Sequence, residues 1–491
     1  MSDLDPAICH RALRARDARF DGRFFVAVTS TGIYCRPICP APTPQQKNCR
    51  FFPSAAAAQA SGFRPCLRCR PEAAPETSAW RGTGGSVARA LVLISEGALD
   101  ADGSVERLAE RLGMGGRHLR RLFEQHLGAS PIAVAQTRRV LLAKQLLHET
   151  DLPMSEVALA AGFRSVRRFN EAFRQLFRRP PSELRRKTRT ALPEGSSSGL
   201  GVRLELAYRP PYAWDAVLAH FRERALGGVE AVRDGRYLRT LAIDGEIASL
   251  DVEHVPARSC LGVRVRCESL AILPRLIERV RRAFDLAADV TGIGAHLARD
   301  PWLAPLVAER PGLRVPGGWD AFEIAVRAIL GQQISVAGAR QLGERLVQLC
   351  GSRREFGSGL THAFPSAAQL AAADVSSLGM PRARHRALEA LARASLADPR
   401  LFDPMGDVQA SVRRFSAIAG VGEWTAQYIA LRGLSEPDAF PIRDRGIERG
   451  IAARSGAELR PSQIAERAER WRPWRAYAAQ HFWFIGGLAQ S

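Results

Sequence analysis

Two short cysteine pairs near the amino terminus constrain the fold of this chain more than any other feature. The first pair is Cys35 and Cys39, the second is Cys66 and Cys69, and the remaining cysteines are scattered along the chain. Two close pairs separated by the span of a small domain are typical of tetrahedral Zn²⁺ bound by four sulfur atoms. We therefore expect a small α/β zinc domain in residues 1–80. One alternative is that these cysteines lie in the core by coincidence. The other is a zinc site whose role is only to stabilise a small domain.

Length and charge indicate a multidomain protein with a polyanionic partner. A chain of 491 residues is too long for a single core. Its net charge is +20, and residues 1–190 carry 31 Lys and Arg against 17 Asp and Glu. A basic front half favours nucleic acid, although a genome rich in G and C would also favour Arg over Lys.

We expect neither a membrane span nor a secretion signal in this chain. Its apolar runs fall short of the roughly 20 residues of a membrane span. The first residues do not combine a basic stretch with an apolar one. We expect no membrane partner and a bacterial cytoplasmic location, with association to the nucleoid when DNA is bound.

A repeated helical pattern follows in residues 84–190. Apolar residues at helical spacing lead to a turn at Gly113 and a second helix, and the same order recurs around Gly162. Helix, glycine turn and helix is a DNA-reading arrangement, so we predict an all-α double helix-turn-helix domain, with 131–147 as one connecting helix. An ordinary helical bundle with a basic face is the alternative. The expected DNA-binding side chains are Arg117, His118, Arg120, Arg121, Arg164, Arg167 and Arg168.

The rest of the chain consists of three regions with different sequence patterns. Residues 188–201 have the composition of a flexible linker. Residues 202–290 mix alternating apolar stretches with two helical ones, which predicts an α+β subdomain. Residues 291–491 are predicted to be all-α, and polar Gln332 and Gln333 interrupt an apolar helical stripe there. The whole chain is therefore expected to be mainly helical.

The stretch from Ile418 to Asp444 carries the features that point most directly to chemistry. A Gly-Val-Gly turn between two helices can present its amides to a phosphate, although a plain helical hairpin is the commoner interpretation. Trp424 and Tyr428 are four residues apart and share a helix face. Asp444 follows a proline-containing loop and fits a helix N-cap.

Two segments of the front half resemble known families. The stretch from Thr31 to Cys39 and GFRPCLRC at 62–69 resemble the amino-terminal domain of the Ada adaptive-response regulator. That resemblance covers about residues 3–75 and implies that Cys35 is both a zinc ligand and an irreversible acceptor of methyl groups from DNA methylphosphotriesters. Residues 84–190, with GFRSVRRFNEAFRQLFRRPPSELRR at their end, resemble the AraC-type DNA-binding domain.

The back half resembles the helix-hairpin-helix glycosylase superfamily, and within it DNA-3-methyladenine glycosylase II, over roughly residues 203–487. The hairpin, RAILGQQISVAGA at 327–339 and ERWRPWRAYAAQHFW at 469–483 carry the likeness. It implies a TBP-like fold for residues 202–290, a catalytic Asp444 and a monovalent cation at the hairpin. It also implies a base pocket of Trp424, Tyr428 and Trp483, with DNA contacts at Gln333, Gly420, Gly422 and Thr425.

Departures from the family pattern refine this expectation. Bifunctional relatives use a lysine just after the hairpin turn, but Trp424 stands there and no lysine follows Lys187, which predicts hydrolysis alone. Two further pocket aromatics of the family correspond to His220 and Arg445, so the pocket should be less aromatic. The polar Gln333 stands where a relative inserts a leucine wedge. The carboxyl-terminal residues contain no four-cysteine run, so no iron–sulfur cluster is expected.

Together these features predict a protein of alkylation repair and response. It would release alkylated bases such as 3-methyladenine and use methylation of Cys35 to switch sequence-specific binding. Its partners would be damaged and promoter double-stranded DNA, with RNA polymerase as a further partner. The alternative is mainly a transcriptional regulator with a weak or altered glycosylase, and a front half that only tethers the enzyme to DNA is a third possibility.

Overall fold

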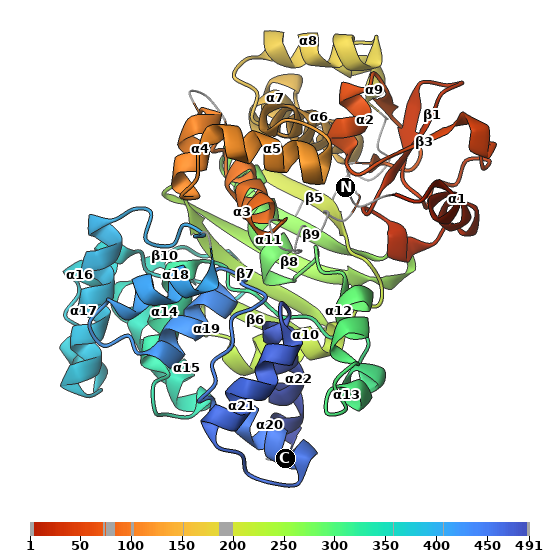
Figure 1. Cartoon of the computed structure of the whole chain (residues 1–491). Coiled ribbons are helices and arrows are strands. Elements are labelled where there is room, and N and C mark those ends of the chain that lie inside the picture. The colour runs from red at the N-terminus through yellow and green to blue at the C-terminus, as the bar shows by residue number, and fades with distance from the viewer. Residues whose placement is uncertain are drawn as a thin grey trace. The chain divides into compact units, whose positions relative to one another are not determined.

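The computed structural model describes residues 4–71, 74, 84–99, 103–150, 152–185, 200–356, 358–405 and 407–488. The chain divides into two compact units, residues 1–210 with 255–278 and residues 211–254 with 279–491. Both are rich in helix, as predicted (Figure 1). Most of the predicted linker lies outside the described residues, and its last two belong to a strand. Among the described residues no helix combines the length and apolarity that a membrane crossing requires.

A four-stranded sheet with strand order β3-β1-β2-β4 builds the predicted zinc domain. β2 and β4 are parallel, and Tyr34 is paired with Pro65. The next residues, Cys35 and Cys66, therefore lie side by side where the two strands end. The elements of this domain are α1 (Pro6–Ala15), β1 (Phe25–Val28), β2 (Ile33–Cys35), β3 (Cys49–Phe52), α2 (Ala55–Ala60) and β4 (Arg64–Pro65).

The helix-turn-helix repeat forms as predicted. Gly113 and Gly162 both have positive φ, 70° and 81°, which glycine adopts without strain. The predicted connecting helix is α6, two residues longer than expected at its end. The helices are α3 (Gly84–Ser95), α4 (Val105–Arg111), α5 (Gly116–Leu127), α6 (Pro131–Glu149), α7 (Met154–Ala160), α8 (Val166–Phe177) and α9 (Pro181–Leu184).

A five-stranded sheet of order β5-β9-β8-β7-β6 lies in the region predicted to be α+β. The pairs β5–β9, β6–β7 and β7–β8 are antiparallel. The elements are β5 (Leu200–Ala207), α10 (Trp214–Arg224), β6 (Glu230–Arg233), β7 (Arg236–Ile243), β8 (Glu246–Val255), β9 (Cys260–Cys267) and α11 (Leu273–Ala283).

The carboxyl-terminal region is almost entirely helical. One part of the all-α expectation was wrong, because β10 (Ser352–Arg353) and β11 (His362–Ala363) form a short antiparallel ribbon. The two strands are only two residues each, too short to leave an alternating pattern in the sequence. The helices are α12 (Val290–Leu297), α13 (Ala304–Glu309), α14 (Ala321–Leu330), α15 (Val336–Cys350), α16 (Ala367–Ala372), α17 (Arg382–Ala397), α18 (Val408–Ser416), α19 (Glu423–Gly433), α20 (Arg445–Ser455), α21 (Pro461–Ala468) and α22 (Arg475–Leu488).

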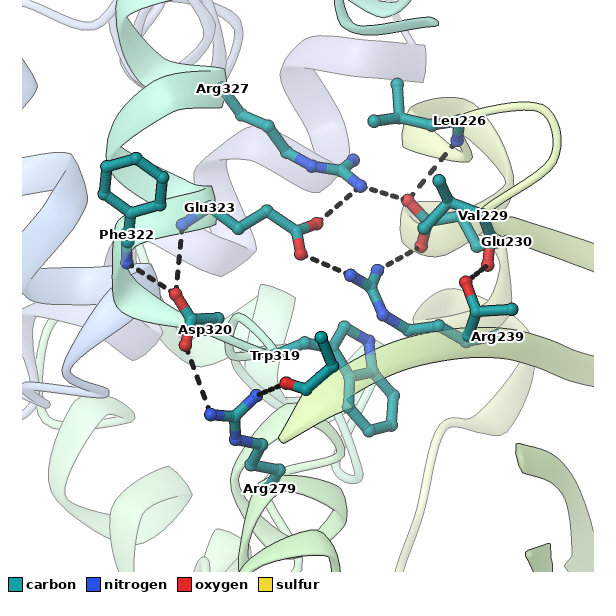
Figure 2. Close-up of polar contacts among 12 residues, drawn as sticks. Leu226, Val229, Glu230, Arg239, Arg279, Trp319, Asp320, Phe322, Glu323 and Arg327 are labelled. Atoms are coloured by element: carbon teal, nitrogen blue, oxygen red, sulfur yellow. Dashed lines mark hydrogen bonds and ion pairs between the residues drawn. The ribbon is translucent and has the colours of Figure 1, made fainter. Parts of the chain in front are cut away.

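A buried network of charges joins the β6–β7 pair to α14 (Figure 2). Arg239 bridges Glu230 and Glu323, and Arg327 bridges the same two carboxylates. All but Arg327 are almost fully buried. Breaking one such pair leaves its partner charged and unpaired, which costs about 3–5 kcal/mol. The network therefore holds α14 in place, and α14 leads directly into the loop that carries Gln332 and Gln333.

Candidate active site and DNA-binding surfaces

The predicted hairpin is formed by α18, a turn and α19. Gly420 has φ of 84°, and a Cβ there would lie 2.5 Å from the Cβ of Ala387, so only glycine fits. Gly422 differs, because its φ is −77° and a Cβ would meet no atom within 4 Å. The fold itself does not require glycine at this second position. Gly422 is exposed and stands immediately before α19, whose first amides have no partner within the helix.

The Asp444 carboxylate is the N-cap of α20 and also the meeting point of two tryptophans. Its Oδ1 accepts hydrogen bonds from the amides of Gly446 at 2.8 Å and Ile447 at 3.1 Å. Trp483 donates its Nε1 proton to the same oxygen at 2.7 Å, and Trp424 donates to Oδ2 at 3.1 Å. Four N–H donors therefore orient this carboxylate, and the N-cap interpretation is confirmed.

The three aromatic side chains predicted for the base pocket come together around Asp444, and we call Trp424, Tyr428 and Trp483 the aromatic cluster. Trp424 and Tyr428 stack with ring centroids 5.4 Å apart, and Tyr428 meets Trp483 edge-on at 6.4 Å. All three rings are partly exposed. Gly446 makes room for Trp483, because a Cβ there would lie 2.8 Å from the Cδ1 atom of the indole.

The loop after α14 is linked to the hairpin through Gln332. Its Nε2 donates to the Gly420 carbonyl at 3.0 Å and to Thr425 Oγ1 at 3.1 Å. The neighbouring Gln333 is exposed and has φ of 58°, a costly conformation for this residue type that is found most often at functional sites. Thr425 is only 3% exposed, and its hydroxyl accepts the hydrogen bond from Gln332. The DNA contact expected at this residue stays a prediction.

The two departures from the family pattern occupy different surroundings. His220 has a pKa well below 6.5, first because of burial and then because of the charges of Arg224, Arg432 and Arg327. Arg445 is exposed in the first turn of α20, directly after Asp444. Burial also lowers the pKa of Arg432 to about 10. The sequence pattern gave no signal for Arg432. It marked Gln332 as part of the break in the apolar stripe but did not predict it as a site residue.

Both candidate reading helices present their basic side chains to the surface. Arg117, His118, Arg120, Arg121, Arg164, Arg167 and Arg168 are all exposed. Ser165 caps α8, whereas Gly115 starts α5 without a side-chain cap. Within this unit, a groove of about 1220 Å³ is lined by zinc-domain residues such as Arg64 and by second-repeat residues such as Arg168.

The four predicted zinc ligands cluster in space. The Sγ atoms of Cys35, Cys39, Cys66 and Cys69 all lie within 4.8 Å of one another. Four thiols at this spacing fit tetrahedral Zn²⁺ with Zn–S bonds of about 2.3 Å. The amide of Arg36 donates to the sulfur of Cys69, and the amide of Arg68 donates to that of Cys66, both at 3.3 Å.

The Cys66 carbonyl accepts a hydrogen bond from Lys144 Nζ at 3.0 Å. Lys144 lies on α6 and is fully buried. This bond connects the Cys66–Cys69 pair to the helix that joins the two DNA-reading repeats.

Family models match nearly the whole chain in four segments. They are the metal binding domain of Ada at residues 8–72, a helix-turn-helix domain at 108–187, the AlkA N-terminal domain at 203–320, and the HhH-GPD superfamily of base excision DNA repair proteins at 326–476. Fold and site thus define a DNA-repair protein of the helix-hairpin-helix class that also carries an Ada-type metal-binding domain.

Individual relatives narrow this to one family. A Mycobacterium tuberculosis protein named "Probable bifunctional transcriptional activator/DNA repair enzyme AlkA" is 42% identical over 97% of this chain and 95% of its own length. The chain belongs to this family of bifunctional transcriptional activators and DNA repair enzymes. DNA-3-methyladenine glycosylase 2 of Escherichia coli is 38% identical over 57% of this chain and 97% of its own length. A solved 3-methyladenine DNA glycosylase from Archaeoglobus fulgidus shares the fold, with a TM-score of 0.52, 18% identity, and coverage of 58% of this chain and 98% of its own.

Proposed function

We propose that the carboxyl-terminal half hydrolyses the N-glycosidic bond of alkylated bases such as 3-methyladenine in double-stranded DNA. The observation that carries this proposal is the Asp444 carboxylate, held by two amides and two indole N–H groups at the centre of the aromatic cluster. Breaking the bond builds positive charge on the sugar, and a preoriented carboxylate stabilises that charge without reorganising. Relatives named as 3-methyladenine glycosylases support the substrate class.

The remaining residues of the site would bind and orient the DNA. The first amides of α19, which follow the exposed Gly422, would bind a phosphate of the backbone. The exposed Gln333 would occupy the space left by a base rotated out of the duplex, and this extrusion costs least where pairing is already damaged. The extruded base would stack on the aromatic cluster. A monovalent cation at the hairpin remains a prediction, and the Gly420 carbonyl in the turn already accepts a hydrogen bond from Gln332.

The reaction would stop at hydrolysis and leave an abasic site. A lyase step needs an amine that attacks the sugar, and Trp424 occupies the position of that lysine in bifunctional relatives. Because no lysine follows Lys187, this half of the chain has no alternative lysine. Incubation with DNA carrying 3-methyladenine should therefore release the base and yield strands that break only after alkali. Immediate strand cleavage, or no release, would contradict the proposal.

We further propose that Cys35 accepts a methyl group from a DNA methylphosphotriester. Among the four ligands Cys35 is the most exposed, at 9% against 6% for the others. The two amide-to-sulfur hydrogen bonds described above go to Cys66 and Cys69, and such bonds reduce the electron density of a thiolate. A bound Zn²⁺ would keep the sulfurs ionised at neutral pH. The Cys35 thiolate would attack the methyl carbon, the S–C bond would form, and the C–O bond would break to leave a phosphodiester anion.

Methylation would remove one negative charge from the cluster and so reduce its repulsion of DNA phosphates. The groove lined by both Arg64 and Arg168 supports contact of one DNA molecule with the zinc domain and the second repeat. The protein would then bind its promoter more tightly and recruit RNA polymerase, and it would act in the bacterial cytoplasm. A front half that only tethers the enzyme is the competing interpretation.

Promoter footprinting before and after exposure to methylphosphotriester DNA separates these two interpretations. Regulation predicts stronger protection after exposure in the wild type and no change in Cys35→Ser. Cys39→Ser serves as the comparison that perturbs the metal site itself, because it removes a ligand. Equal protection of the promoter by the wild type before and after methyl transfer would favour the interpretation that the front half only tethers the enzyme to DNA.

A further inference from the structure

Arg432 lies behind the aromatic cluster on α19. The carbon Cζ of its guanidinium is 4.8 Å from the ring centroid of Trp483, and the side chain is only 3% exposed. Its Nη1 donates to the Pro316 carbonyl at 2.7 Å, and its Nη2 donates to Gln480 Oε1 at 2.8 Å. Both acceptors are neutral, so these hydrogen bonds orient the guanidinium without neutralising its charge.

The electrostatic neighbours of Arg432 are the residues of the candidate active site. Burial lowers its pKa to about 10, Tyr428 and Asp444 act to raise it, and Arg224 acts to lower it further. At neutral pH the guanidinium therefore remains charged. Among the further groups that interact with Arg432, burial raises the pKa of Asp285 to about 6, and His220 has its pKa held well below 6.5 and is neutral. The guanidinium charge of Arg432 and the carboxylate of Asp444 thus both act on Trp483, the cation against its ring and the anion at its Nε1.

This arrangement affects the bases that the cluster can hold. A cationic base is attracted to an electron-rich ring, but one face of Trp483 already carries the Arg432 cation. A second cation on that ring would be repelled through a poorly hydrated interior, where charges are screened weakly. A neutral base would gain the same stacking without this repulsion.

We propose that Arg432 is a specificity-determining residue that shifts base release away from cationic and toward neutral damaged bases. It would act through Trp483 and the local electrostatic field, without touching the reacting atoms. The proposal rests on the proposed glycosylase function and names the charge of the base as the property that the site discriminates.

Single-turnover release of cationic 7-methylguanine and neutral hypoxanthine from otherwise identical duplexes tests the proposal. Arg432→Gln and Arg432→Met remove the charge, and either should raise the ratio of cationic to neutral release by about tenfold. Arg432→Lys retains the charge and should keep the ratio within about twofold of the wild type. The ratio is measured within one preparation, so partial loss of folded protein cancels.

Arg467→Gln is a matched control, because Arg467 stacks on Trp302 with its Cζ 3.5 Å from the ring centroid and lies outside the aromatic cluster. It should leave the ratio unchanged. An unchanged or lower ratio of cationic to neutral base release in both Arg432→Gln and Arg432→Met would overturn the proposal. It would also be overturned if the wild type released 7-methylguanine but no measurable hypoxanthine. A shift of more than tenfold in Arg432→Lys would also overturn it. A wild type that released neither these bases nor 3-methyladenine would instead refute the proposed function.

Discussion

Replacing Asp444 by asparagine separates the capping role of this side chain from its charge. An asparagine oxygen can still accept hydrogen bonds from the amides of Gly446 and Ile447, so the start of α20 should persist. Its Nδ2 would then face the Nε1 proton of Trp424, which loses the hydrogen bond now measured at 3.1 Å. One unsatisfied donor costs about 1–3 kcal/mol of folding free energy. The variant should therefore fold with modestly reduced stability.

The loss of charge should affect base release far more. A carboxylate about 4 Å from the developing sugar cation, at an effective dielectric constant of about 20, contributes roughly 4 kcal/mol. We therefore expect release of 3-methyladenine to slow by about 10³-fold in single-turnover assays, while DNA binding changes little. Asp407→Asn is the matched control, because Asp407 caps α18 by accepting from Ala410 at 2.7 Å and should retain full activity. Release by Asp444→Asn within tenfold of wild type would refute a charge-based role for this carboxylate.

Three other perturbations follow from the structure. Burial lowers the pKa of His481 from 6.5 to about 4, so the folded state resists its protonation and loses up to about 3 kcal/mol of stability as the pH falls from 7 to 4. In His481→Gln, the free energy of unfolding measured by denaturant titration should depend less on pH over this range, and an unchanged pH dependence would contradict this. Gly115→Ser should raise the free energy of unfolding by about 0.5–1 kcal/mol, because the N-cap of α5 lacks a side-chain acceptor and a Cβ there meets no atom within 4 Å. An unchanged unfolding midpoint would contradict this. Glu423→Gln should raise DNA affinity a few-fold at about 0.1 M salt, because the exposed Glu423 carboxylate lies in the first turn of α19, beside the amides proposed to bind a phosphate. Equal affinity of the variant and the wild type in fluorescence anisotropy would mean that the phosphate binds elsewhere.

Local patterns were sufficient to predict most elements and several site residues. The turns predicted at Gly113 and Gly162 are present, and both glycines have positive φ. The zinc ligands were predictable because metal sites require particular residue types at short spacing. The brief β10–β11 ribbon was missed, because two-residue strands leave no periodic signal.

Sequence alone determined the chemical groups available to this protein: four thiols in two pairs, a glycine hairpin followed by Asp444, and no lysine after Lys187. Those features depend on residue identity and short-range spacing, which a linear sequence displays directly. Only the tertiary structure brought Trp483 to Asp444 across 39 residues, placed Gln332 over Thr425 and set Arg432 against Trp483. Such contacts depend on how helices pack, and packing is decided by shape and burial over long sequence separations. The sequence therefore predicted a carboxylate for the reaction, while the buried cation that would influence which bases it acts on emerged from the fold.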